Sequence, residues 1–336
     1  MRVQIIGFGN IGQGFAEILI RKNELLRKSY ALELKVVSIT DITGTAVDEK
    51  GLDLSKALEV MKKGKGLLGY PGAKKMNGLE AIETVDADVV VEATPTKIID
   101  GEPGLGHMLL AMEKGRHVVT SNKGPLALKF SELKDAARKN QVKFKFEASV
   151  GGAMPIINFA KETLSGDKIY AIEGILNGTT NYILTRMSKE ERPFETVLRE
   201  AQEIGIAEAD PSYDIDGIDT ACKLVILANT IMGIKATYKD VSTQGIRKIT
   251  PEAVKLAKED GYAIKLIGEV KNSYLEVSPR LVPVNHSLNV EGVLNVGLFK
   301  TDIAGDITIV GKGAGAIETN SAVLSDLISI WRNGMR

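Results

Sequence analysis

The fold of this chain is decided near its N-terminus, by the stretch Val3-Gln4-Ile5-Ile6-Gly7-Phe8-Gly9-Asn10-Ile11-Gly12. The β-branched run at its start predicts a strand, and the apolar spacing over residues 11–19 predicts a helix. Gly7 permits a tight turn between them, Gly9 lets a pyrophosphate approach the backbone, and Gly12 allows close packing of helix on strand. The phosphates would then lie at the helix N-terminus, where unpaired N–H groups favour anions. The stretch therefore predicts a dinucleotide-binding turn.

A second predicted strand, residues 34–40, ends in Asp41, where a dinucleotide-binding fold places a ribose-binding acid. The alternative is a glycine turn in an ordinary α/β domain. Asp41 suits a ribose 2′-hydroxyl and repels a 2′-phosphate, which favours NAD, whereas Lys50 or Lys56 would favour NADP if the following loop folds back. We expect NAD or NADP to contact Gly7, Phe8, Gly9, Asn10, Ile11, Gly12 and Asp41.

The alternation of strands and helices continues through residue 146 and implies a parallel sheet. Further strands are predicted at 88–92, 117–120 and 143–146, with helices near 54–63, 104–114 and 131–140. In open α/β sheets, ligands bind beyond the carboxyl ends of the strands. We therefore expect three residues that follow strands to lie at the cofactor edge: Thr94, Ser121 and Lys123.

Beyond residue 150 the alternation of single strands and helices ends. Strands are predicted at 168–176, 264–270, 275–284, 295–300 and 306–310, and helices are grouped between residues 180 and 260. Such segregation indicates an α+β domain. We predict an α/β protein with a Rossmann-type parallel-sheet domain at 1–150, an α+β domain at 151–310, and a C-terminal helix at 311–336 that returns to the first domain.

The stretch Gly205–Lys223 carries a cluster of acids followed by a single lysine, and residues 224–234 are uncharged. Asp219 and Lys223 are four residues apart, so they share one face of the predicted helix. One interpretation is a surface ion pair, with Asp216 as the helix N-cap. The apolar run favours a buried helix instead, with carboxylates and lysine forming a pocket for a cationic or zwitterionic ligand. The acids are Glu208, Asp210, Asp214, Asp216 and Asp219.

Composition restricts the class of protein. The 336 residues carry 43 basic and 43 acidic side chains, which argues against nucleic-acid or membrane-surface binding driven by net charge. Cys222 is the only cysteine, so a disulfide framework and a cysteine-based zinc site are excluded. The first predicted strand leaves no room for a signal peptide, and no apolar run is long enough for a membrane span. We expect a cytoplasmic protein.

Six motifs together resemble the homoserine dehydrogenase family, in the family's order along nearly the whole chain. The resemblance implies an NAD(P)-dependent reversible reduction of L-aspartate 4-semialdehyde to L-homoserine, in threonine and methionine biosynthesis. It also implies a homodimer built through the second, catalytic domain, and this chain ends without room for the regulatory domain that many members carry. The motifs are Gly-Phe-Gly-Asn-Ile-Gly-Gln-Gly (7–14), Thr-Ser-Asn-Lys-Gly-Pro-Leu-Ala (120–127), Glu-Ala-Ser-Val-Gly-Gly-Ala-Met-Pro (147–155), Gly-Ile-Leu-Asn-Gly-Thr-Thr-Asn-Tyr-Ile (174–183), 205–223 and Gly-Ala-Gly-Ala-Ile-Glu-Thr (313–319).

The resemblance also implies roles for single residues. Glu208 matches the ligand of the substrate amino group, and Asp214 and Asp219 support the same pocket. Lys223 matches the proton donor to the aldehyde oxygen, and Lys123 matches a second lysine proposed for that role. Gly205 and Gly315 match backbone positions near the cofactor or substrate. A loop of backbone carbonyls that holds a monovalent cation, Na⁺ or K⁺, in some members matches Glu147, Val150, Gly152 and Met154.

Two other functions remain open from the residues alone. A semialdehyde dehydrogenase that oxidises through a thiohemiacetal needs a cysteine nucleophile. Cys222 is next to Lys223, about 100° away around the helix, so both cannot point at one carbonyl group. The other alternative is a dinucleotide sensor without catalytic activity.

Overall fold

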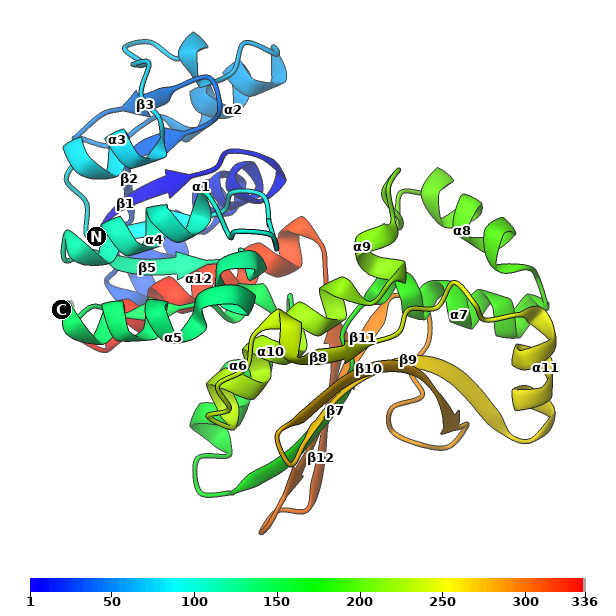
Figure 1. The fold of residues 1–336 in the computed structure, drawn as a ribbon. Coiled ribbons are helices and arrows are strands. Elements are labelled where there is room, and N and C mark those ends of the chain that lie inside the picture. Colours follow the sequence, from blue (N-terminus) through cyan, green and yellow to red (C-terminus); the bar gives the residue numbers. More distant parts are fainter. Residues whose placement is uncertain (335–336) are drawn as a thin grey trace. The chain divides into compact units, whose positions relative to one another are not determined.

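The computed structural model describes residues 1–334, and the chain divides into two compact units (Figure 1). The first unit comprises Met1–Ser149 together with the chain from Gly315 onward, and the second comprises Val150–Ala314. In the described part of the chain, no helix combines the length and the apolar character that crossing a membrane requires.

The elements of the first unit alternate between strand and helix, as the sequence predicts. They are β1 (Arg2–Ile6), α1 (Asn10–Tyr30), β2 (Lys35–Thr40), β3 (Thr45–Val47), α2 (Leu54–Lys62), η1 (Leu67–Gly69), α3 (Gly78–Thr84), β4 (Val89–Glu92), α4 (Gly104–Glu113), β5 (His117–Thr120), α5 (Lys123–Lys139), β6 (Phe144–Lys145), η2 (Glu147–Ser149) and α12 (Ala316–Arg332).

The first sheet has the strand order β3-β2-β1-β4-β5-β6, and every pair except β2–β3 is parallel. This confirms the predicted Rossmann-type sheet. The antiparallel strand β3 was not predicted. It forms because the Asp41 carboxylate accepts hydrogen bonds from the N–H groups of Thr43 and Gly44, which turn the chain back beside β2.

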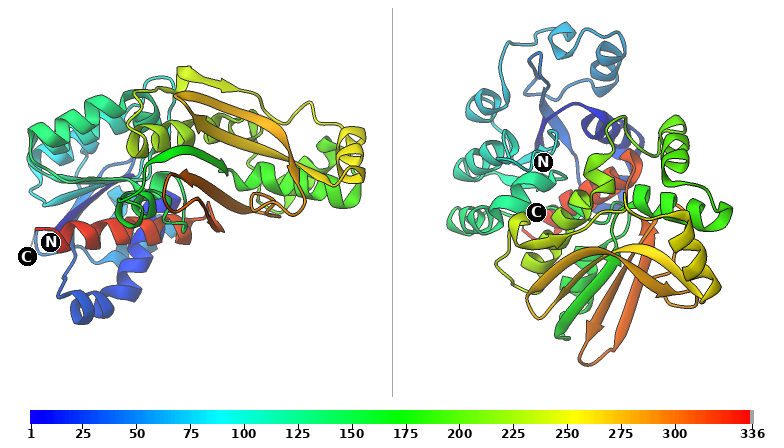
Figure 2. Two further views of the ribbon diagram at one scale, coloured as in Figure 1. Left: turned by 90° about the horizontal axis from the view of Figure 1, so that it is seen from below. Right: turned by 45° about the vertical axis from the view of Figure 1, so that its right-hand side comes forward.

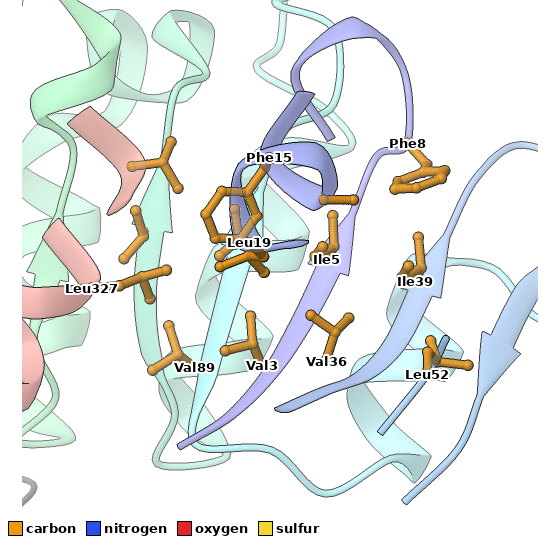
Figure 3. Close-up of a cluster of buried hydrophobic side chains, with 14 of the residues drawn as sticks. Val3, Ile5, Phe8, Phe15, Leu19, Val36, Ile39, Leu52, Val89 and Leu327 are labelled. Atoms are coloured by element: carbon orange, nitrogen blue, oxygen red, sulfur yellow. The ribbon is translucent and has the colours of Figure 1, made fainter. Parts of the chain in front are cut away.

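The core of the first unit lies between the sheet and helices α1 and α12. Figure 3 shows Val3 and Ile5 of β1 with Phe15 of α1 and Leu327 of α12, and all four side chains are fully buried. Each such side chain contributes about 1.5–3 kcal/mol through burial. The helical spacing after the glycine turn therefore produces the packing that holds the turn against the strand.

Helix α12 returns to the first unit, as predicted, and runs beside α1 (Figures 1 and 2, red). The Asn320 amide donates to the Ile11 carbonyl at 3.0 Å, and the Trp331 indole donates to the Tyr30 carbonyl at 2.9 Å. These bonds join α12 to both ends of α1, including the turn of α1 nearest the glycine motif.

Helix α5 differs from its prediction, because it begins at Lys123 rather than near Ser131. Asn122 caps the helix by accepting the Gly124 N–H, and Pro125 is compatible with the first turn. The helix is irregular at Lys129, where φ is −136°. The predicted helix covered residues 131–140, and in the structure Pro125 and the residues around it form the start of the same helix.

The second unit contains a sheet with helices grouped beside it. Its elements are α6 (Ile156–Asn158), η3 (Phe159–Thr163), β7 (Ile169–Ile175), α7 (Gly178–Glu190), α8 (Phe194–Glu203), α9 (Ser212–Ile215), α10 (Ile218–Ile231), η4 (Tyr238–Asp240), β8 (Val241–Thr243), α11 (Pro251–Glu259), β9 (Tyr262–Lys271), β10 (Tyr274–Pro283), β11 (Leu294–Thr301) and β12 (Asp306–Lys312).

The second sheet has the order β12-β11-β7-β9-β10-β8 and is antiparallel except for the short pair β10–β8. Helices α7 and α10 pack against its central strand β9 (Figure 1). The α10 side chains from Asp219 to Asn229 are all buried, as the uncharged run 224–234 predicts for a core helix. The predicted α+β architecture is confirmed.

Candidate active site

Two positions of the glycine turn in the first unit have no room for a side chain. Gly7 has φ +97°, and a Cβ there would lie 2.6 Å from the Ala93 carbonyl group. A Cβ on Gly12 would lie 2.2 Å from the Gly7 oxygen. The turn can therefore be this tight only with glycine at both positions.

Gly9 differs from the other two glycines, because open space surrounds the position of its absent Cβ. It is the N-cap residue of α1 and gives the helix no side-chain cap, so the first N–H groups of a 21-residue helix face this space. Asn10 is exposed and Ile11 half-buried, whereas Phe8 is 2% exposed and belongs to the core. Residues 9–12 thus fit the pyrophosphate of a dinucleotide, and Phe8 can contribute only its backbone.

The Asp41 carboxylate, which we expected to contact the ribose, accepts hydrogen bonds from its own loop and from Leu67. Oδ1 accepts from the Thr43 N–H at 2.7 Å, the Thr43 hydroxyl at 2.6 Å and the Gly44 N–H at 3.0 Å. Oδ2 accepts from the Leu67 N–H at 3.0 Å. Asp41 is half-buried and fixes the shape of the loop at the carboxyl end of β2.

Lys65 lies nearer to this loop than Lys50, which is one of the two lysines considered from the sequence. Lys50 lies in a turn beside the start of β2, since the Leu52 N–H donates to the Val36 carbonyl at 2.8 Å. Lys50 is therefore near the start of β2, whereas Asp41 follows the end of the same strand. Lys65 is exposed, and its neighbour Gly66 packs directly against Thr43. Lys65 is therefore better placed than Lys50 to approach a 2′-phosphate.

A second group of polar side chains lies at the carboxyl ends of β4 and β5, organised by the fully buried Glu92. Glu92 Oε1 accepts from the N–H of Thr94 at 3.0 Å and also from its hydroxyl, and Oε2 lies 3.2 Å from the Thr120 hydroxyl. The Asn122 amide donates to the Thr94 hydroxyl at 3.3 Å, and the Ser121 N–H donates to the Glu92 carbonyl at 3.4 Å. The structure thus brings Thr94 and Ser121 together at the predicted edge.

Lys123 follows these residues as the first residue of α5. Its N–H lies 3.4 Å from the Thr96 hydroxyl, and the residue is half-buried. Lys123 belongs to the first unit and Lys223 to the second.

In the second unit, Asp219 and Lys223 form a buried ion pair on the first turns of α10. Their Oδ2 and Nζ atoms are 2.7 Å apart, and both residues are 6% exposed. Lys223 Nζ also donates to the Leu176 carbonyl at 2.6 Å. Two of the three N–H groups of the ammonium are thereby used within the described chain, and one is left for a ligand.

Asp214 joins this pair through a residue to which the sequence interpretation gave no role. The side-chain amide of Asn177 donates to Asp214 Oδ1 at 2.7 Å and to Asp219 Oδ2 at 2.9 Å. Burial raises the pKa of Asp214, the negative charge of Asp219 raises it further, and the Asn177 hydrogen bond opposes both effects. The resulting group of four consists of Asn177, Asp214, Asp219 and Lys223, and we call it the acid–lysine cluster.

Glu208 lies outside the hydrogen bonds of the acid–lysine cluster in the described chain. Its side chain is exposed on the loop between α8 and α9. The Thr179 hydroxyl anchors this loop by donating to the Ile206 carbonyl at 3.1 Å. Gly205, with φ +75°, ends α8 in the left-handed conformation typical of helix C-termini. Glu208 is thus available to a ligand but is not held in place by the cluster.

Two features of the surface interpretation are wrong in the structure. Asp216 does not cap α10, because Gly217 is the N-cap residue and Asp216 pairs with Arg247 at 2.5 Å. Asp219–Lys223 is buried rather than a surface pair. Cys222 is fully buried, with its sulfur 3.5 Å from the Tyr213 hydroxyl, so it is not exposed to attack a substrate carbonyl.

The residues predicted to hold a cation lie on both sides of the unit boundary. Glu147 is buried in η2, and its N–H donates to Asp326 of α12 at 2.9 Å. Val150, Gly152 and Met154 belong to the second unit, where the Met154 N–H donates to the Gly151 carbonyl at 2.8 Å. Gly315 begins α12 with φ +119°.

Sequence reasoning missed the functions of Glu92 and Asn177 within these groups. Glu92 carried a signal, because a carboxylate that ends the apolar run Val-Val-Val must be buried or at a sheet edge. Asn177 lies between a strand and the helix that it caps, and this position suggests only an N-cap. Its contacts with Asp214 and Asp219 cross 37 and 42 residues of chain, and no local pattern reports them.

Comparisons with known proteins agree across both units. A family model described as homoserine dehydrogenase matches residues 155–328, and one described as the NAD binding domain of homoserine dehydrogenase matches residues 7–147. The homoserine dehydrogenase of Methanocaldococcus jannaschii is 56% identical over 334 residues, which cover 99% of this chain and 99% of that protein.

Solved structures are similar over the same length. A crystal structure from Archaeoglobus fulgidus, assigned as a homoserine dehydrogenase, superposes with a TM-score of 0.91 at 46% identity and covers 98% of this chain and 99% of its own. A hyperthermophilic archaeal homoserine dehydrogenase in complex with NADPH has a TM-score of 0.85 at 31% identity, covering 98% and 97%.

Proposed function

This chain belongs to the homoserine dehydrogenase family, and from that premise we propose that Lys223 is its proton donor in the reduction of L-aspartate 4-semialdehyde to L-homoserine. The chain is an NAD(P)-dependent oxidoreductase. The observation that carries the proposal is the position of Lys223 Nζ, buried between Asp219 at 2.7 Å and the Leu176 carbonyl at 2.6 Å, with one N–H not used by residues 1–334.

The chemistry of an aldehyde reduction explains why such a lysine is needed. Bound NAD(P)H supplies a hydride, and its arrival at the aldehyde carbon builds negative charge on the oxygen. A fixed ammonium that directs an N–H at this oxygen stabilises the charge and then gives up the proton. Asp219 and Leu176 orient Lys223 for this role. In the reverse direction, the neutral amine of Lys223 accepts the proton from the homoserine hydroxyl.

We propose that the exposed carboxylate of Glu208 binds the substrate ammonium, with Asp214 and Asp219 adding negative charge to the same pocket. Support comes from the tie between Thr179 and Ile206, which anchors the loop of Glu208 to the first turn of α7. The same end of α7 carries Asn177, so one helix start organises both the loop and the acid–lysine cluster.

For the cofactor, we propose that both NADP and NAD bind at Gly7–Gly12, with the nicotinamide end near Thr94, Ser121 and Lys123. The open space at Gly9 and the uncapped start of α1 support the position of the pyrophosphate. Asp41 favours NAD, and the nearby exposed Lys65 favours NADP. Dissociation constants for NADPH and NADH, measured by fluorescence titration, test whether the chain discriminates between them.

We also propose roles for the remaining site residues. Gly205 and Gly315 would adjoin cofactor or substrate, and carbonyl oxygens of Glu147, Val150, Gly152 and Met154 would hold Na⁺ or K⁺. Carbonyls without a cluster of fixed charge suit a weakly held hard cation rather than a transition metal. Activity after dialysis with EDTA tests this, because a requirement for zinc or iron would contradict a carbonyl site.

We also propose a cytoplasmic homodimer built through the second unit. Support for the dimer comes from apolar side chains exposed on the strands of the second sheet, with Tyr274 57%, Leu281 59% and Val310 48% exposed. Light scattering after size-exclusion chromatography gives the mass in solution. A free, buried cysteine suits a reducing compartment, and cell fractionation tests this location.

One assay tests the function as a whole. Purified protein mixed with NADPH and L-aspartate 4-semialdehyde should consume the reduced nicotinamide, followed by its absorbance, and form homoserine. A dinucleotide sensor would bind NADPH without consuming it. A semialdehyde dehydrogenase would instead generate NADPH from NADP and the aldehyde. Either of those results would overturn the proposed reaction.

A further inference from the structure

The connection between β7 and α7 contacts every charged member of the acid–lysine cluster within two consecutive residues. The Leu176 carbonyl accepts from Lys223 at 2.6 Å. The next residue, Asn177, reaches both Asp214 and Asp219. A short piece of chain from one side of the cluster thus holds side chains supplied by α9 and α10.

Both ends of the Asn177 amide are engaged, and this fixes its orientation. Oδ1 accepts the Thr180 N–H at 2.9 Å and lies 3.1 Å from the Thr180 hydroxyl, so it caps α7. The two Nδ2 hydrogens point at Asp214 at 2.7 Å and at Asp219 at 2.9 Å. A flipped amide would lose the cap and place an oxygen against two carboxylates, so the cap keeps the donors on the carboxylate side.

Asp214 and Asp219 need such a donor, because two like charges lie close together where burial weakens solvation. Lys223 neutralises only one of them directly, through its bond to Asp219 at 2.7 Å. The pKa of Asp214 is raised by burial and by Asp219, and it is lowered first by the Asn177 hydrogen bond, then by the charge of Lys223 and by the Thr179 side chain. Without the amide, Asp214 would take up a proton or turn away, and Asp219 would lose one of the hydrogen bonds that fix its rotamer.

We propose that Asn177 is a positioning residue for this reaction, whose amide clamps Asp214 and Asp219 together and thereby fixes the direction in which Lys223 presents its remaining N–H. This inference rests on the proposed role of Lys223. It assigns Asn177 no contact with substrate or cofactor.

The deciding variant is Asn177→Ser, because serine also caps helices but is too short to reach both carboxylates. We expect kcat/KM for the semialdehyde to fall roughly 10- to 100-fold, since small misplacements of a catalytic group cost up to about 10² in rate. The KM for NADPH should not change. The acidic limb of the pH profile should move to higher pH, because Asp214 loses a donor that lowers its pKa. Asn177→Asp keeps the cap but adds a third carboxylate, and it should be more impaired than Asn177→Ser.

Asn77→Ser is the matched control, because Asn77 caps α3 through the equivalent bond to the Glu80 N–H at 3.0 Å and lies far from these groups in the sequence. It should retain wild-type kinetics and pH profile. A carboxyl NMR titration of Asp214 in wild type and Asn177→Ser provides a readout that needs no turnover. Wild-type kinetics and an unmoved Asp214 titration in Asn177→Ser would overturn the inference. Loss of the proposed function would appear differently, as a wild-type protein that consumes no NADPH.

Discussion

The candidate cofactor site of the first unit is formed by backbone, whereas the acid–lysine cluster of the second unit is formed by side chains, three of them buried and that of Asp214 half-buried. The glycine turn spans six consecutive residues, and its key position, Gly9, borders open space. The cluster combines residues from a strand end and two helices, and Asn177 and Asp219 are 42 positions apart. The glycine turn requires that no side chain fill the space beside its glycines. The acid–lysine cluster requires that each of its side-chain hydrogen bonds be made. The two should therefore respond differently to substitution.

The largest expected effect is at Lys223. Lys223→Met should lower kcat in both directions by roughly 10²–10⁴-fold, the usual value of general acid–base catalysis, while NADPH affinity stays nearly intact. Single-turnover hydride transfer at saturating NADPH and semialdehyde, over a range of pH, isolates the chemical step. Lys123→Ala tests the competing donor. If Lys223→Met keeps near-normal chemistry and Lys123→Ala does not, the proton donor is Lys123 and the buried pair is structural.

A substitution in the glycine turn should weaken NADPH binding and should not slow the chemical step. Gly9 has φ −79° and an unobstructed Cβ direction, so Gly9→Ala should fold with an unchanged Tm. The added methyl group enters the space proposed for the pyrophosphate, and we expect the Kd for NADPH to rise about 10- to 100-fold, the equivalent of one lost hydrogen bond to a charged group. Gly166→Ala, at another glycine with open surroundings, is the control. Unchanged NADPH affinity in Gly9→Ala would show that the phosphates bind elsewhere.

Glu208 tests whether the exposed part of the second site serves binding alone. An ammonium ligand acts equally in the ground and transition states, so Glu208→Leu should raise the KM for the semialdehyde with little change in kcat. The loss of one charge-assisted hydrogen bond corresponds to about tenfold or somewhat more. Steady-state kinetics with Asp210→Leu, a nearby exposed acid, controls for general charge. A fall in kcat with KM unchanged would assign Glu208 to the chemistry.

A smaller effect is expected at Asp41, where backbone and side-chain recognition meet. Its carboxylate accepts four hydrogen bonds from its loop and from Leu67, so Asp41→Ala should loosen that loop. It also removes a charge that repels a 2′-phosphate, so the ratio of NADH to NADPH dissociation constants should shift toward NADPH by about tenfold or less. Lys65→Ala should shift it the other way. If Asp41→Ala changes stability but not this ratio, Asp41 is a loop residue and not the discriminator.

The same contrast explains which features could be predicted from the sequence. The glycine turn is local, so its strand, helix and open phosphate position follow from ten consecutive residues. The Asp219–Lys223 contact also follows from sequence, because four residues make one helical turn. The clamp at Asn177, the buried Glu92 and the strand β3 depend on contacts between distant segments or on side-chain bonds within a loop. The sequence can predict that Asn177 caps a helix, but it cannot predict which carboxylates accept the two side-chain N–H groups.

The smallest effect, a shift in stability with pH, distinguishes two acids of one stretch. The pKa of Asp214 is raised in the folded protein by burial and Asp219, and that of exposed Asp210 is lowered by Ser212. A carboxyl group whose pKa is raised by folding contributes stability that is complete below the ordinary aspartate pKa and is lost as pH rises through the folded pKa. A carboxyl group whose pKa is lowered contributes stability above the ordinary pKa and loses it as pH falls through the folded pKa. Asp214→Asn removes this unfavourable charge and should therefore raise Tm at pH 8 by a few degrees, since 1 kcal/mol of stability shifts Tm by roughly 2–4 °C. The gain should shrink as the pH is lowered. Asp210→Asn should lower Tm slightly at pH 8. Thermal melts from pH 4 to 8 compare the two, and a loss of Tm in Asp214→Asn at pH 8 would mean that Asp214 is stabilised, not strained, by its place in the cluster.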